Sequence, residues 1–127
     1  MSLNERESLE FWRRAVTGYV RSEEADLTAR QQAVLMTVAL TPGPHTVRGL
    51  AAHLDIAKPA VTRALDALER VGLVCRRRDQ DDLRSVFVER TSDGMAWLHN
   101  FARLIVTAEI EDQSRARPHL QDGRVAA

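Results

Sequence analysis

The segment from Thr46 to Arg90 decides the fold of this 127-residue chain: TVRGLAAHLDIAKPAVTRALDALERVGLVCRRRDQDDLRSVFVER. Its first part predicts a short helix over 47–54, because apolar residues recur there at helical spacing. Thr46 can cap this helix, since its hydroxyl can accept an unpaired backbone N–H. Asp55 then marks a sharp turn, because Asp tolerates left-handed dihedral angles better than most residues.

A second helix is expected to begin near Lys58. Pro59 fits only in a first helical turn, where the missing N–H costs nothing. Gly72 is the residue expected to end this helix. Three apolar residues face inward: Val61, Leu65 and Leu68. The other face shows Lys58, Thr62, Arg63, Asp66 and Arg70.

Two strand-like runs over 73–78 and 84–89 come next, joined by a polar tip at 79–83. Val86 and Val88 alternate with outward positions, as in a half-buried strand. Two short helices followed by such a hairpin predict a helix-turn-helix with a wing.

Helical patterns flank this unit on both sides. The first runs over about 7–21, and the second begins with the capping-box pair Thr28 and Gln31 and ends near Leu40. A loop at 41–46 contains two prolines, and His45 is expected to add a short edge strand. Thr91 can cap a final helix. Pro118 stops that helix and leaves a frayed tail over 118–127.

The flanking helices carry more apolar surface than one small domain is expected to bury. Two neighbouring apolar stripes run along the final helix, and one runs along the first. One of these surfaces is expected to pack against a second copy of the chain. The predicted dimerisation residues are Trp12, Tyr19, Trp97, Phe101 and Leu104.

The charge of the chain does not by itself point to nucleic acid. The formal net charge is zero, although the segment 46–90 holds an excess of two positive charges. Any affinity for DNA must therefore depend on where individual arginines lie. Cys75 is the only cysteine, which suits a reducing cytoplasm, and neither a signal peptide nor a run of membrane length is visible.

The stretch LAAHLDIAKPAVTRALDALERVGLVCRRRDQDDLRS, followed by RTSDG, resembles the winged helix-turn-helix of MarR-type bacterial transcription regulators. The resemblance covers roughly Leu27 to Gly94. It implies a second helix that lies in the major groove of DNA and a hairpin tip that reaches the adjacent minor groove. On the family's D-x-R pattern the tip residues are Asp82 and Arg84. The chain departs from the family at Asp55 and Ala57, where Gly and Ser are common.

The resemblance implies a homodimer that binds double-stranded DNA in the cytoplasm and uses no cofactor. The predicted fold is mainly α with a small β-hairpin, a single winged helix-turn-helix domain over 1–127. Its DNA-binding part covers 46–90, dimerisation helices cover 5–21 and 91–117, and the tail covers 118–127. The predicted DNA-binding residues are Thr46, Lys58, Pro59, Thr62, Arg63, Arg76, Arg78, Asp82 and Arg84.

Other functions stay open on the sequence alone. Winged helices also serve as protein–protein modules. A redox sensor at Cys75 is a second alternative, although strand parity places this thiol beside Leu73 and favours a structural role. The histidines lack metal-ligand spacing and no nucleophile–base pattern is visible, so no metal site and no enzyme is predicted. The identity of any small-molecule effector is left open.

Overall fold

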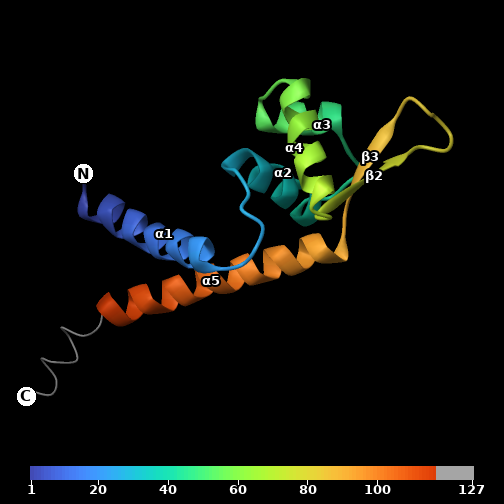
Figure 1. Cartoon of the computed structure of the whole chain (residues 1–127). Coiled ribbons are helices and arrows are strands. Elements are labelled where there is room, and N and C mark those ends of the chain that lie inside the picture. Colours follow the sequence, from blue (N-terminus) through green and yellow to red (C-terminus); the bar gives the residue numbers. More distant parts are fainter. Residues whose placement is uncertain (117–127) are drawn as a thin grey trace, which may run out of the picture. The chain divides into compact units, whose positions relative to one another are not determined.

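The computed structural model describes residues 1–116, and the predicted helix stop at Pro118 and the tail over 118–127 lie outside them. The described residues are mainly helical with one small antiparallel sheet, which confirms the predicted fold class (Figure 1). No helix in this part of the chain is long and apolar enough to span a membrane. The elements are α1 (Leu3–Arg21), α2 (Ala29–Leu40), β1 (His45–Thr46), α3 (Val47–Leu54), α4 (Lys58–Arg70), β2 (Val74–Arg78), β3 (Val86–Arg90) and α5 (Ser92–Ala116).

The chain divides into two compact units. The central unit consists of Ala25–Leu98, and the terminal unit consists of Met1–Glu24 together with the chain from His99 onward. Helix α5 contributes its first turns to the central unit and its remainder to the terminal unit. The predicted helix-turn-helix and wing therefore lie in the central unit.

The core of the central unit is formed by α2, α3, α4 and the inner face of the sheet. Local sequence signals define these helices as expected. The Thr46 hydroxyl accepts the Gly49 N–H at 3.0 Å, and Asp55 adopts the left-handed conformation with φ of 54°. The capping box at Thr28 and Gln31 is formed. The fully buried side chains include Val34, Leu35, Leu50, Val61, Leu65, Leu68 and Val74.

The sheet has the strand order β1-β3-β2 and is antiparallel throughout. His45 pairs with Val88, which confirms the expected edge strand. The wing tip is longer than predicted, because β3 begins at Val86 rather than at residue 84. The Asp79 N–H donates to the Ser85 carbonyl and the Ser85 N–H donates to the Asp82 carbonyl, both at 2.9 Å. These bonds hold Arg84 and Ser85 in the turn instead of the ladder.

The junction between β3 and α5 is fixed against the end of α4. The Thr91 hydroxyl accepts the Gly94 N–H at 2.9 Å, as a helix cap does, and donates to the Gly72 carbonyl at 2.7 Å. A Cβ atom at Gly94 would overlap the Leu73 carbonyl oxygen. Only glycine therefore allows α5 to start this close to the strand that follows α4.

The terminal unit pairs α1 with the later turns of α5. Helix α1 begins at Leu3, earlier than predicted, because Ser2 caps it by accepting the Glu5 N–H. The Tyr19 and Phe101 rings meet edge to face, with 5.3 Å between centroids. The Arg14 side chain is only 7% exposed and donates to Asp112 at 2.8 Å.

Three of the five predicted dimerisation residues do not offer the expected free surface. Trp97 is 2% exposed, and its indole N–H donates to the Ala25 carbonyl within the central unit. Tyr19 and Phe101 are also buried within their own chain. The expectation that these rings are left over for a partner is wrong, because the chain packs them itself. Trp12, at 44% exposed, and the partly exposed Leu104 remain accessible.

Candidate nucleic-acid interface

Helix α4 presents a polar, exposed face along its N-terminal half. Its buried face packs Ala60, Val61 and Ala64 into the core, which turns the neighbouring positions outward. The predicted contact residues on that outward face are all exposed: Lys58, Pro59, Thr62 and Arg63. The structure places a proline in the first turn of α4, as the sequence predicted.

Arg76 is held by the protein itself. Its guanidinium lies 2.7 Å from Asp66 and 2.9 Å from Glu69, and its backbone N–H donates to Glu69 at 2.9 Å. The hydrogen bonds from Arg76 lower the pKa of Glu69, and those to Glu69 and Asp66 raise the pKa of Arg76. We call this group the Arg76 clasp; it joins the wing strand β2 to α4. Sequence reasoning assigned Arg76 to DNA and missed these carboxylates, which lie seven and ten positions away along the chain.

The two arginines that follow Arg76 also have protein partners. Arg77 lies 2.6 Å from Glu89 across the hairpin and stacks over the Phe87 ring, 5.4 Å from its centroid. Arg78, a predicted DNA contact, donates to the Leu83 carbonyl at 2.9 Å and is exposed. One bond to a neutral carbonyl leaves the Arg78 charge unneutralised.

Asp82 shapes the wing tip through the backbone. One carboxylate oxygen accepts the Arg84 N–H at 3.1 Å, and the other accepts the Ser85 hydroxyl at 3.2 Å. Within residues 1–116 no hydrogen bond or ion pair joins Asp82 to the Arg84 guanidinium. An acid two residues before an N–H closes a local turn more readily than it reaches a long side chain.

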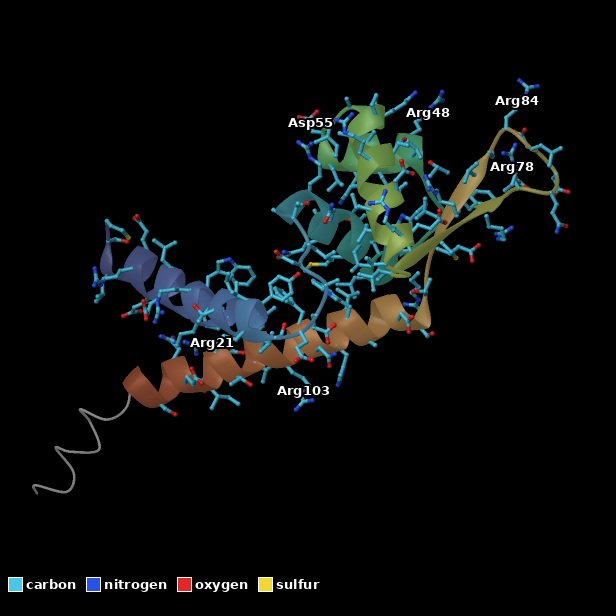
Figure 2. All side chains as sticks on the ribbon, viewed as in Figure 1. Arg21, Arg48, Asp55, Arg78, Arg84 and Arg103 are labelled. Atoms are coloured by element: carbon cyan, nitrogen blue, oxygen red, sulfur yellow. The ribbon has the colours of Figure 1, made fainter. Side chains whose placement is uncertain are left out.

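Arg84 is exposed at the wing and has no hydrogen bond or ion pair from its side chain within the described residues. Figure 2 shows the Arg84 side chain extending outward from the wing tip. Thr46, also predicted as a DNA contact, is half-buried and caps α3. The two residues are brought together at one cavity of about 460 Å³.

Arg48 is a functional candidate that the sequence analysis did not single out. It lies in the first turn of α3, is exposed, and lines the same cavity as Arg84. The sequence carried a signal, since Arg48 is one of few cations between the apolar positions of that helix. The position of Arg48 beside the wing depends on tertiary packing and could not be predicted from the sequence.

Cys75 lies on the opposite face of the hairpin from that expected. The cysteine is exposed, whereas both Leu73 and Val74 are buried. Strand parity failed because β2 begins at Val74, so Leu73 precedes the alternating pattern. Across residues 1–116 no group of three or more His, Cys, Asp or Glu side chains is placed to hold a metal ion.

Comparisons with known proteins agree with this arrangement. The model of the MarR family matches residues 27–86. The structure of CouR, described as a transcriptional repressor bound to a 23-mer DNA duplex, is 29% identical, with a TM-score of 0.65 over 96% of this chain and 82% of that one. A glycine-to-lysine mutant of MepR from Staphylococcus aureus is 24% identical, with a TM-score of 0.76 over 98% of this chain and 88% of that one.

A third similar structure is the transcriptional regulator Tm0710 from Thermotoga maritima. It is 20% identical, with a TM-score of 0.68 over 98% of this chain and 81% of that one. At this identity the likeness shows the fold alone. No curated protein matches the chain.

Proposed function

We infer that this chain, whose residues 27–86 match the model of the MarR family, is a cytoplasmic transcription regulator that binds specific sequences in double-stranded DNA as a homodimer. The observation that carries the inference is the exposed polar face of α4, which carries Lys58, Thr62 and Arg63. An α-helix fits the major groove, and residues near its N-terminus reach base edges. The DNA-bound structure of the similar protein CouR supports the assignment.

The wing supplies the second contact in this proposal. Asp79, Asp81 and Asp82 would repel DNA unless their carboxylates turn back toward the protein. Two of them do so, because Asp79 accepts the Asp81 N–H and Asp82 accepts the Arg84 N–H. Arg84 then remains the cation that extends outward. A narrow minor groove has an enhanced negative potential that attracts such an arginine.

A homodimer requires apolar surface that the chain leaves uncovered. The terminal unit has such surface on both of its helices. The exposed apolar residues are Leu9, Trp12 and Val20 on α1, and Val106 and Ile110 on α5. These side chains replace the buried rings Tyr19, Phe101 and Trp97 as the proposed contacts. Two symmetric copies place two recognition helices about one helical turn apart on DNA.

Selection of bound fragments from random duplex DNA tests the proposed function. The wild-type chain should enrich a near-palindromic motif whose half-sites are about one helical turn apart. Arg70→Ala is the matched control, because Arg70 is an exposed arginine in the last turn of α4 and should leave the motif unchanged. Absence of any enriched motif, with no salt-sensitive binding to duplex DNA, would favour a protein–protein module instead.

A further inference from the structure

A cavity between the start of α3 and the wing has the chemistry of an anion site. Its volume is about 460 Å³, and it is lined by Thr46, Val47, Arg48, Arg84, Ser85 and Val86. Two of the six lining residues are arginines and none is acidic. A guanidinium carries a fixed charge and a planar set of donors that suits phosphate oxygens. The lining therefore favours an anionic group over a neutral or cationic one.

The two arginines of this cavity have no carboxylate partner among the described residues, unlike Arg76 and Arg77 of the wing strand β2. Arg76 and Arg77 both form ion pairs with carboxylates of the protein. For Arg48 and Arg84, the described residues provide no ion pair, and both side chains are exposed. Figure 2 shows both side chains projecting outward from the central unit. The Thr46 hydroxyl accepts the Gly49 N–H, which leaves its own O–H able to donate.

We propose that this cavity seats one phosphate of the DNA backbone and that Arg48 is the cation that holds it. The proposal rests on the proposed function and names a contact within it. If α4 lies in the major groove and the wing reaches the adjacent minor groove, the strand that separates the two grooves passes between these elements. The cavity is bounded by the start of α3 on one side and the wing on the other. Arg48 then neutralises the backbone, while Arg84 is directed to the groove.

Salt dependence of binding to the selected duplex tests the proposal in the full chain. Arg48→Ala should lower the slope of log affinity against log salt by about one, because each neutralised phosphate contributes about 0.9. The affinity should fall equally for duplexes with A·T-rich and G·C-rich flanks. Arg84→Ala should instead lose most affinity on A·T-rich flanks. Arg70→Ala is the control, since it removes the same charge outside the cavity.

A neutral methylphosphonate placed at single backbone positions sharpens this test. One position per half-site should weaken binding by the wild-type chain and leave binding by Arg48→Ala unaffected, because the contact is already lost. Arg48→Lys should restore part of the salt slope. The proposal is overturned if Arg48→Ala has the same slope as Arg70→Ala and responds to every methylphosphonate as the wild-type chain does.

Titration with inorganic phosphate separates this proposal from the proposed function. The Arg48 Nε resonance of the DNA-free chain should shift saturably, and by more than that of Arg70. If no duplex is ever selected, the proposed function fails. The titration then remains as the test of whether the cavity beside Arg48 binds phosphate. Equal shifts of Arg48 and Arg70 would then overturn it.

Discussion

Arg63 is exposed on the outward face of α4, one position after Thr62, and can meet either a base edge or a phosphate. If it pairs with guanine, Arg63→Ala should weaken binding to the selected duplex by about 1–3 kcal/mol. The affinity should fall only for duplexes that contain that base pair. The preference for one base pair per half-site should therefore be relaxed. Affinities measured across single-base variants of the duplex give the result.

An even loss of affinity over all base variants would assign Arg63 to phosphate instead. Arg63→Lys provides a control, since it keeps the charge and removes the bidentate geometry. Binding unchanged by both substitutions would remove Arg63 from the interface.

Single residues show where sequence reasoning succeeds and where it stops. Thr46, Thr28 and Asp55 act locally, through groups within four residues, and their roles as caps and as a turn were predictable. Asp82 also acts locally, but the sequence did not reveal that its carboxylate would choose the backbone over a guanidinium. The predicted face of Cys75 was wrong because alternating side chains can be assigned to the two faces of a strand only when its first residue is known. The boundaries of a strand are harder to predict from sequence than its existence.

At the scale of elements, the Arg76 clasp joins β2 to α4. Glu69 has a lowered pKa in the folded chain, so the stabilisation it provides is present above its unfolded pKa and is lost as pH falls through its folded pKa. Glu69→Gln should therefore destabilise the chain near neutral pH and have little effect in acid well below 4.5, the ordinary value of this group. The loss should be at most about 1 kcal/mol, because the pair is partly exposed.

Denaturant unfolding of both chains at the two pH values measures this difference. Glu10→Gln is the control, since Glu10 pairs with Arg13 within α1 of the terminal unit. The free energy of unfolding of Glu69→Gln could instead differ from that of the wild type by the same amount at both pH values. That result would show that the Glu69 charge does not stabilise the fold.

At the start of α5, replacing glycine by alanine is predicted to destabilise the fold, whereas the same replacement inside a helix is normally stabilising. Replacing a helical glycine by alanine normally stabilises a helix by about 1 kcal/mol. Gly94→Ala should destabilise the central unit by about 1–3 kcal/mol or more, because the new Cβ overlaps the Leu73 carbonyl oxygen. Thermal unfolding monitored by circular dichroism measures the effect. An increase in Tm would show that α5 shifts without cost.

The elements themselves were largely predictable, and their mutual contacts were not. Periodicity and caps located α3 and α4, because a helix depends on residues that are neighbours in sequence. The wing tip was predicted too short because its end is fixed by bonds from Ser85. The clasp at Arg76 and the cavity beside Arg48 depend on elements that meet only in the folded chain.

For the whole molecule, burial decides which side chains are available to a second copy. Trp97 is buried, so Trp97→Glu would disrupt the central unit and could not report on assembly. Ile110 is 58% exposed on α5 and is a cleaner choice. We predict that the chain is a dimer burying at least about 1,000 Å² and that Ile110→Glu shifts it toward monomer with its helical content retained.

Sedimentation velocity at micromolar concentration, together with circular dichroism, checks this prediction. Leu40→Glu is a control, because Leu40 is 66% exposed but belongs to the central unit. A wild-type chain that sediments as a monomer would contradict the predicted assembly.

The most direct test of specific DNA recognition compares two duplexes of equal length. Fluorescence anisotropy at physiological salt gives Kd for the selected duplex and for a scrambled duplex of the same composition. A sequence-specific regulator should bind the selected duplex about 10³-fold more tightly or better. Equal Kd values for the two duplexes would contradict specific recognition by α4 and the wing.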